Sequence, residues 1–313
     1  MKRVNIGKVS YGGWDNCIHI TNNVVDLIIT ADVGPRIIRY GFTGKENELC
    51  EVGETLGSKG GDKWRIYGGH RLWHAPEHRI RSYEPDNSPV KWEEIPDGVR
   101  TIQDIGPLTR IRKEMEITLS PEGSRVSILH RLTNSGTCPV ELSVWSISAM
   151  ATGGKEVVPH VAADTDLLPN RVMVLWPYTR LNDPRLRFLD RYIVLRHDPN
   201  MEQPVKLGTS NESGWAAYFN HDHLFIKYYT HVGHAQYPDL GASYETYAND
   251  YMLEMETLSP YTLLAPEGQV EHHEAWELFD NVPAPRDDSD EIYGILSGRI
   301  NPFKKQAGPD SLL

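Results

Sequence analysis

The chain has few cysteines and no long apolar run. Its three cysteines, Cys17, Cys50 and Cys138, are widely spaced among 313 residues and form no CxxC pair. Such a set argues against a disulfide framework or a zinc ribbon and fits a reducing compartment. No stretch approaches the roughly 18 apolar residues of a membrane span, and the charged N-terminal residues precede no apolar signal segment. We therefore predict a cytoplasmic protein that has no membrane partner.

The chain also lacks a surplus of basic residues. Its 32 lysines and arginines are outnumbered by 43 acidic residues, which gives a formal net charge of -11. A surface of this kind repels phosphate backbones, and no basic run interleaved with aromatics offsets it. The motifs of serine hydrolases, P-loop proteins and dinucleotide-binding proteins are absent. We expect no nucleic-acid partner and no cofactor.

Short apolar runs with alternating side chains are what the chain has in abundance, and 26 glycines and 21 prolines break them. Such runs indicate strands. The predicted strands are Val24–Thr30, Arg36–Phe42, Arg110–Leu119, Arg125–Thr133, Val140–Ala149, Arg171–Leu175, Tyr192–Leu195, Leu224–Tyr229, Tyr251–Leu258 and Val270–Leu278. A short helix is plausible near Ser289–Leu296. Because helical crossovers do not alternate with the strands, we predict an all-β fold, a large antiparallel β-sandwich with few short helices.

The organisation of the chain indicates one unit. We find no internal repeat and no low-complexity linker, and large β-sandwiches often reach about 250 residues as one domain. We therefore predict a single β-sandwich domain over residues 1–313, present as a monomer or a homodimer. The proline-rich segments 76–98 and 176–204 are predicted to be long loops. The C-terminal tail, 302–313, is predicted to be flexible.

A first candidate site segment runs from Tyr67 to Glu77 and begins with two glycines that permit a tight turn or a close approach to a ligand. Its functional side chains are His70, Arg71, Trp73, His74 and Glu77. A sugar site needs this mixture, because a flat apolar ring covers the C–H face while fixed donors and acceptors bind the hydroxyls. The alternative is a polar turn with a half-buried tryptophan.

A second candidate segment presents Trp176, Tyr178, Asp183 and Arg185. Prolines at 177 and 184 restrict the preceding residues to extended geometry, so the loop is stiff. These side chains could bind substrate. They could equally be an aromatic plug and a local Asp–Arg pair.

A third segment runs from Lys227 to Glu277. Its candidate substrate-binding residues are Lys227, Tyr237, Asp239 and Glu245, and a strand with Glu254 and Glu256 follows. Because side chains alternate in a strand, the last two carboxylates should share a face, about 6.6 Å apart at a rise of roughly 3.3 Å per residue. A partly buried acid pair is suited to proton transfer near neutral pH. The alternative is an acidic strand face in water.

Histidines could in principle bind a metal. His70 and His74 have the spacing of one helical turn, and His272 and His273 lie beside glutamates, but the first pair follows a Gly-Gly turn where a helix is not expected. We therefore predict no metal site. Asn220–His223 has the composition of a hairpin turn, and its histidines are predicted to be solvated.

The order of these segments resembles a known family. It runs from Gly34-Pro35-Arg36-Ile37 through GGHRLWHAPE, WPYT, DPR, FIK, YPD and LEMETLSP to LLAPEGQVEHHEAWEL. This order looks like the DUF4380-type proteins, a branch of the galactose-mutarotase-like superfamily, over about residues 15 to 280. The resemblance implies a twisted β-sandwich that holds a sugar on one sheet face. Aldose 1-epimerases of that superfamily open and close the ring with a carboxylate base and a histidine acid.

The resemblance also implies roles for particular residues. Met255-Glu256-Thr257 resembles the epimerase Leu-Glu-Thr motif, which makes Glu256 the expected base and Glu254 the second choice. The Gly68-Gly69 match implies His70 as the acid and Arg71 as a hydroxyl ligand. The sequence departs from the pattern after Leu132-Thr133-Asn134, because the next strand, around Trp145, has no histidine. Either His70, His74 or Lys227 supplies the proton instead, or the protein does not epimerise.

Three functions stay open on the sequence. The first is an aldose 1-epimerase-like isomerase that acts on the anomeric centre, and the second is a glycoside-cleaving lyase or hydrolase on the same fold. The third is a non-catalytic carbohydrate-binding protein. In each case the partner is a small sugar, and the basic residues Arg36, Arg71, Arg185 and Lys227 favour an anionic one.

Overall fold

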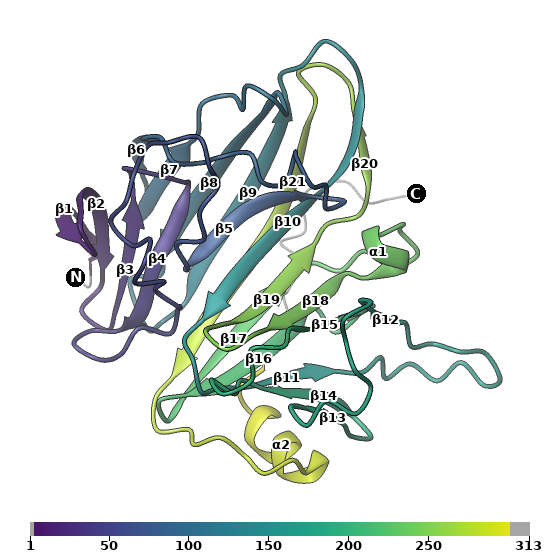
Figure 1. Ribbon diagram of the computed structural model, residues 1–313. Helices are drawn as coiled ribbons and strands as arrows, with labels where there is room; N and C mark the ends of the chain where they lie inside the picture. Colours follow the sequence, from purple (N-terminus) through teal and green to yellow (C-terminus); the bar gives the residue numbers. More distant parts are fainter. Residues whose placement is uncertain (1–2, 301–313) are drawn as a thin grey trace, which may run out of the picture.

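The computed structural model describes residues 3–300 and confirms the all-β prediction (Figure 1). Two large sheets, which we call the first and the second sheet, consist of antiparallel strand pairs. The first has the order β1 (Asn5–Tyr11), β2 (Trp14–Thr21), β3 (Val25–Thr30), β4 (Arg36–Phe42), β5 (His70–Ala75), β10 (Val140–Met150), β19 (Leu253–Leu258), β18 (Tyr244–Ala248), β15 (Val205–Thr209) and β12 (Met173–Leu175), with β20 (Thr262–Leu264) paired to β10.

The second sheet contains the remaining strands. Its order is β13 (Leu186–Phe188), β14 (Tyr192–Arg196), β11 (Lys155–Pro159), β16 (Trp215–Asn220), β17 (His223–Tyr229), β21 (Gln269–Phe279), β9 (Val126–Asn134), β8 (Ile111–Leu119), β7 (Gly98–Ile102) and β6 (Lys91–Ile95). All ten predicted strands are present, with ends that shift by at most two residues. The segment 76–98 is not entirely loop as predicted, because the polar run Lys91–Ile95 pairs with β7 as an exposed edge strand. The segment 176–204 is not entirely loop either, because it contains β13 and β14.

Helices are short in the described residues. The predicted helix near the C-terminus is α2 (Ser289–Leu296), and the Asp288 side chain caps it by accepting from the N–H groups of Asp290 and Glu291. The other, α1 (Pro238–Gly241), spans four residues, three of which have positive φ. No helix within residues 3–300 is long and apolar enough to cross a membrane. The predicted flexible tail, 302–313, lies outside the described residues.

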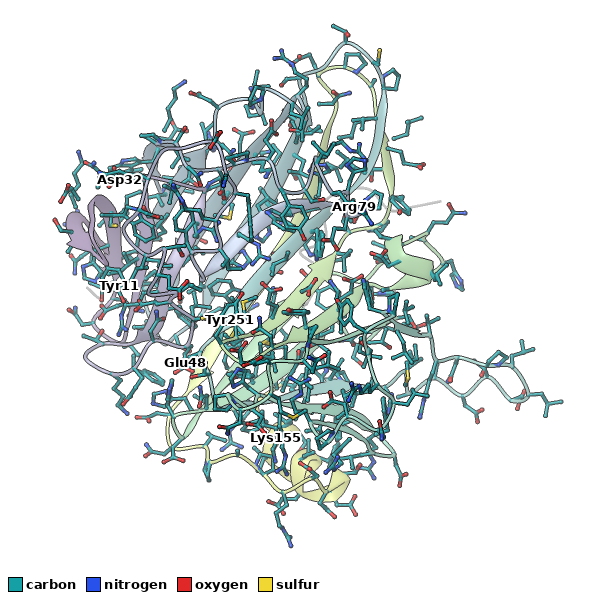
Figure 2. The ribbon with its side chains drawn as sticks, viewed as in Figure 1. Tyr11, Asp32, Glu48, Arg79, Lys155 and Tyr251 are labelled. Carbon is teal, nitrogen blue, oxygen red and sulfur yellow. The ribbon has the colours of Figure 1, made fainter. Side chains whose placement is uncertain are left out.

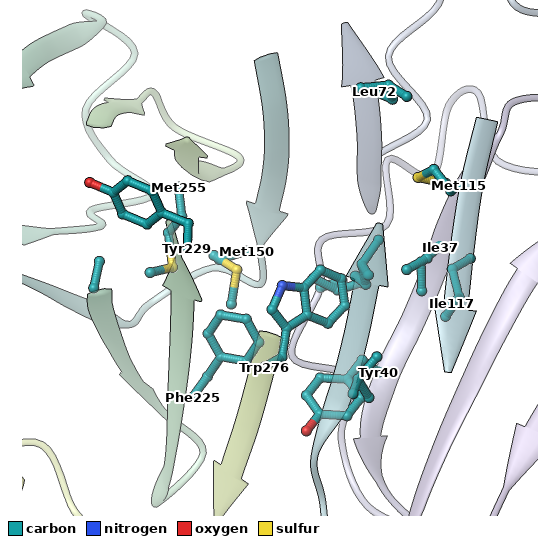
Figure 3. Close-up of a cluster of buried hydrophobic side chains, with 14 of the residues drawn as sticks. Ile37, Tyr40, Leu72, Met115, Ile117, Met150, Phe225, Tyr229, Met255 and Trp276 are labelled. Carbon is teal, nitrogen blue, oxygen red and sulfur yellow. The ribbon is translucent and has the colours of Figure 1, made fainter. Parts of the chain in front are cut away.

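The main hydrophobic core lies between the two sheets (Figure 3). Trp276 of β21 is fully buried, and its ring lies 5.6 Å from that of Tyr40 in β4 and 5.7 Å from that of Phe225 in β17. Full burial of one large apolar side chain contributes roughly 1.5–3 kcal/mol. Contacts of this kind between the sheets therefore fix the face that each strand turns toward the core.

The register of three neighbouring strands determines what the opposite face of the first sheet presents. In β10, Ile147 lies opposite Arg71 of β5 on one side and opposite Glu256 of β19 on the other. Glu256 in turn lies opposite Glu245 of β18. Because directly paired residues point to the same side of a sheet, these four side chains share the face that is turned away from the core. We call this face the outer face.

Candidate functional site

The outer face of the first sheet is hollowed over β5, β10, β19, β18 and β15. Two adjoining hollows of about 410 and 550 Å³ share six lining residues and form one cleft. The shared residues are Glu77, Tyr83, Trp145, Trp176, Tyr178 and Lys206. Figure 2 labels one further residue of each hollow, Tyr251 in the smaller and Arg79 in the larger. This volume is within the range of small-molecule sites.

Aromatic rings form much of the cleft wall. The rings of Trp64, Trp73 and Trp145 meet edge to face in a chain, with centroids 5.4 Å apart at each contact, and Tyr83 lies 5.3 Å from both Trp64 and Trp73. Edge-to-face packing holds the rings rigidly. Such a wall offers flat apolar surface for the C–H face of a sugar ring.

An arginine–carboxylate pair lies in the smaller hollow. Arg71 Nη1 donates to Glu254 Oε1 over 2.7 Å, and the guanidinium lies 4.7 Å from the ring centre of Trp73. Both side chains are more than nine-tenths buried yet line the cleft. The pair therefore presents a fixed donor and a fixed acceptor beside an aromatic face.

A lysine stands at the centre of the cleft, where the two hollows meet. Lys206 Nζ lies 2.8 Å from Glu245 Oε2 and 2.9 Å from Glu256 Oε2, between the rings of Trp145 and Trp176 at 4.8 and 4.7 Å. Burial lowers the pKa of Lys206, but Glu256 and Glu245 outweigh it and raise that pKa above its ordinary value. The ammonium group is thus a permanent donor and cannot act as a base near neutral pH.

The two carboxylates that bind Lys206 have unusual protonation. Burial and the neighbouring Glu256 raise the pKa of Glu245 well above its ordinary value, although Lys206 opposes this. Burial raises the pKa of Glu256 in the same way, again against Lys206. Because they are coupled through one lysine, these acids titrate as a pair that tends to retain a proton.

Many of the predicted site residues do come together. Eight of them line the cleft: Arg71, Trp73, Glu77, Trp176, Tyr178, Asp239, Glu245 and Glu254. Glu256 shares their face but does not line the cleft, because its Oε2 is held by the indole N–H of Trp145 at 2.8 Å and by Lys206. Tyr237 packs behind the wall with Trp73 and Trp145, and its ring stacks on His231.

The two histidines proposed as acids lie on the opposite face of β5, which corrects that expectation. His70 and His74 alternate with Arg71 and Trp73 and are buried on the inner side of the sheet. Burial lowers the pKa of His70 well below its ordinary value and lowers that of His74 to about 3. Neither histidine can supply a proton to the cleft.

Lys227 is also misplaced by the sequence analysis, because it is buried between the sheets. Its Nζ lies 3.0 Å from Glu274 Oε1 and donates to Ser148 Oγ and to the carbonyl of Met255. His70, His130 and Glu274 nearby have ligand atoms within 4.8 Å of one another. Since Lys227 already neutralises Glu274 and the group is fully buried, this set forms a closed polar network.

Asp183 and Arg185 form the local pair that was the alternative to substrate binding. Arg185 donates from Nε and Nη2 to both carboxylate oxygens of Asp183, over 3.0 and 2.8 Å. Arg185 also donates to the carbonyl of Gln203 and lines a separate hollow of about 280 Å³. The pair therefore anchors the loop and does not reach the cleft.

Several cleft residues were missed by the sequence analysis. They are Trp64, Ile66, Arg79, Tyr83, Trp145, Pro204, Lys206, Tyr247, Tyr251 and Met252. Trp145 could have been found, since it lies in the strand where the resemblance calls for a catalytic histidine. Lys206 stands in the unremarkable run Val205–Thr209, which carries no signal of its role.

Several proteins of known structure share this fold. A galactose mutarotase-like protein from Lactobacillus casei superposes with a TM-score of 0.55 at 12% identity, over 84% of this chain and all of the other (100%). A galactose mutarotase-like protein from Clostridium acetobutylicum gives 0.51 at 12%, over 90% and 100%. The chain has the galactose-mutarotase-like fold. The Slr1438 protein from Synechocystis gives 0.54 at 11% identity, over 87% and 99%. No protein-family model and no curated protein sequence matches the chain.

Proposed function

We propose that this chain is a carbohydrate-active protein that holds a sugar ring in the cleft of the first sheet and acts at its anomeric centre, as an aldose 1-epimerase-like isomerase. The observation that carries the proposal is one cleft with both kinds of contact a sugar needs. Four tryptophans give apolar faces, and Arg71–Glu254 and Lys206 give fixed polar groups. The assignment to DUF4380-type proteins within this fold is likewise a proposal, which rests on the sequence motifs.

The charges of the cleft favour a neutral sugar over the anionic one that the sequence suggested. Each of the four basic residues behind that idea has a carboxylate partner: Arg36 with Asp86, Arg71 with Glu254, Arg185 with Asp183, and Lys227 with Glu274. The cleft itself has Arg71, Arg79 and Lys206 against Glu77, Asp239, Glu245 and Glu254. An anionic sugar would gain little attraction there.

Two carboxyl groups in different environments support acid–base chemistry. Glu254 is ion-paired with Arg71 and lines the cleft, so it is our candidate base in place of Glu256. Glu245 belongs to the pair that retains a proton and also lines the cleft, so it is our candidate acid. The two lie on diagonal positions of β18 and β19, about 7–8 Å apart by sheet geometry.

Exchange spectroscopy by NMR tests the activity, with a panel of neutral aldoses. We expect Glu254→Gln to lower the rate of anomer exchange by about 10²–10⁴-fold, the usual contribution of a general base. Glu94→Gln, an exposed glutamate in β6, serves as the matched control and should leave the rate unchanged. The rate should also fall as the pH rises through the raised pKa of Glu245, because the acid then loses its proton. Wild-type exchange no faster than the uncatalysed reaction across the panel would remove the isomerase.

A binding protein without turnover is the second candidate. It is favoured by the engagement of the cleft carboxylates, since Glu254 and Glu245 are ion-paired and Glu77 accepts from the Tyr83 hydroxyl over 2.6 Å. Such groups hold a ligand without moving a proton. Saturable sugar binding that survives Glu254→Gln, with no exchange and no cleaved product, would select this candidate. Release of a shorter sugar from an oligosaccharide would instead select a glycoside-cleaving enzyme.

A further inference from the structure

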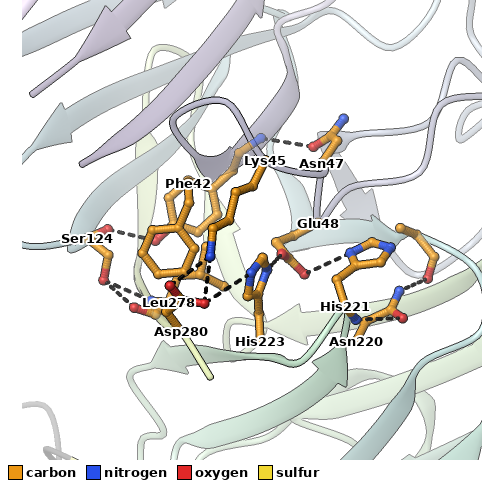
Figure 4. Close-up of polar contacts among 12 residues, drawn as sticks. Phe42, Lys45, Asn47, Glu48, Ser124, Asn220, His221, His223, Leu278 and Asp280 are labelled. Carbon is orange, nitrogen blue, oxygen red and sulfur yellow. Dashed lines mark hydrogen bonds and ion pairs between the residues drawn. The ribbon is translucent and has the colours of Figure 1, made fainter. Parts of the chain in front are cut away.

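A second cluster of ligand-type side chains lies at the β16–β17 hairpin (Figure 4), and none of its residues lines the cleft. Glu48 belongs to the segment between β4 and β5, whereas His221 and His223 belong to the hairpin of the second sheet. One ligand atom from each of the three residues lies within 4.8 Å of the others. The sequence analysis expected solvated histidines here. The hairpin turn is confirmed, but His223 is only 2% exposed, so that expectation is wrong for it.

The distances within the cluster suit a small cation. His223 Nδ1 lies 2.6 Å from Glu48 Oε1, and His221 Nδ1 lies 3.8 Å from Glu48 Oε2. Metal–ligand bonds of about 2.0–2.1 Å in tetrahedral geometry separate ligand atoms by about 3.3 Å, a value between these two. Small side-chain rotations are therefore enough to bring all three ligands to one ion.

Glu48 provides an independent sign of a missing partner. Its side chain is fully buried, and its Oε2 atom accepts no hydrogen bond in the described structure, because its contact with His221 Nδ1 at 3.8 Å is too long for one. A buried carboxylate oxygen that accepts no hydrogen bond is costly, since burial removes its water. A cation at this point would satisfy it.

The surroundings of His223 have the arrangement that supports metal-binding histidines elsewhere. Its second ring nitrogen, Nε2, lies 3.5 Å from Asp280 Oδ1, and Lys45 Nζ holds Asp280 over 2.7 Å. A carboxylate behind a ligating imidazole fixes the ring and its tautomer. The edge of the imidazole also packs against Phe42, with ring centres 5.1 Å apart. His223 is thus oriented before any ion binds.

We propose that Glu48, His221 and His223 form a binding site for a divalent transition-metal ion of the zinc type. Two imidazole nitrogens and one carboxylate are ligands that Zn²⁺ prefers, and they leave a fourth position for water. The ion would replace the direct contact between His223 Nδ1 and Glu48 Oε1, since both atoms would then bind the metal. Because Glu48 lies in the segment that joins β4 and β5 of the first sheet and the hairpin belongs to the second sheet, the ion would link the two sheets at this end. The site is independent of the sugar proposal.

Calorimetric titration of the full-length, tag-free protein with Zn²⁺ tests this site. We expect one bound ion per chain, a loss of affinity of at least 10-fold in His221→Ala and Glu48→Gln, and no change in His273→Ala. His273 is an exposed histidine of β21 and is the matched control. Addition of Zn²⁺ at about 100 times its Kd should raise the Tm of the wild type by roughly 5 °C, and that of His221→Ala much less.

Visible absorption of bound Co²⁺ reports the ligand set directly. Co²⁺ on the wild type should give the intense bands of a tetrahedral site, and His221→Ala should abolish them. His221 lies on an exposed turn, so this variant should fold, which its metal-free Tm and circular dichroism verify. The proposal is overturned if Zn²⁺ fails to bind, or if it binds wild type and His221→Ala equally well.

Discussion

Both faces of the strands β5, β10 and β19 carry polar residues, but only those of the outer face border a cleft. The outer face presents Arg71 and Glu254 at the wall of a cleft, with room for a ligand beside them. The inner face carries His70 and, with Lys227 and Glu274 from the second sheet, forms a buried network whose members bond to one another. Polarity alone therefore does not identify a site. The outer face differs from the inner face because it borders a hollow and a ligand can reach its polar groups.

The inner face should be the most sensitive to substitution. Lys227→Met should destabilise the fold by about 3–5 kcal/mol, because it leaves the buried Glu274 carboxylate without its cation. Urea denaturation measures the loss. The double variant with Glu274→Gln should recover part of it, since the two residues form one pair. An unchanged midpoint in Lys227→Met would contradict the assignment of these residues to a closed structural network.

A second effect concerns the pH dependence of stability, which a buried carboxyl group of β11 should control. Burial raises the pKa of Glu156, which accepts from Tyr244 and Thr246 of β18, to about 8. Between the ordinary value of 4.5 and about 8, the folded state binds a proton that the unfolded state does not, so stability falls as the pH rises. Glu156→Gln cannot lose that proton. Its free energy of unfolding should exceed that of the wild type at pH 8.5 by roughly 2–4 kcal/mol, with little difference at pH 5. Parallel pH profiles for the two proteins would disprove the raised pKa.

The smallest of the three effects concerns the outer face. Trp176 comes from the loop over the cleft, and its ring lies against Lys206. Trp176→Ala should weaken sugar binding by about 1–2 kcal/mol, or roughly 5–30-fold, because one stacking face is lost. Thermal stability should change little, since the ring is only partly buried. Titration calorimetry beside a thermal scan checks both. Affinity that falls only in step with Tm would assign Trp176 to the fold.

The sequence could predict most of the fold and one strand of the site. Period-two alternation identifies strands such as Arg36–Phe42, and it puts Glu254 and Glu256 on one face because that pattern is local. It cannot decide which of two neighbouring polar residues points outward. His70 and Arg71 alternate in β5, and only the pairing of Arg71 with Ile147 of β10 sets the choice.

The rest of the site depends on contacts distant in sequence. Lys206 acquires its role from Glu245, Glu256 and two tryptophans that lie 30 to 61 residues away. The sequence of β15 itself therefore gives no indication of those neighbours. The resemblance to epimerases predicted a histidine acid, and this prediction is wrong for His70 and His74. The strand in which epimerases carry their histidine has Trp145, whose indole N–H donates to Glu256. A shared motif identifies the equivalent position in the strand, but the chemistry of the side chain at that position depends on the residues around it.

Saturation-transfer difference NMR on a library of neutral mono- and oligosaccharides is the sharpest test of a sugar site in this cleft, because it detects which sugar protons contact the protein. We predict that at least one sugar receives saturation, strongest at the C–H protons of one ring face, and that Trp176→Ala markedly weakens the signal while Glu94→Gln preserves it. Saturation of equal strength in the wild type and Trp176→Ala, or none from any member of the library, would contradict a sugar site in this cleft.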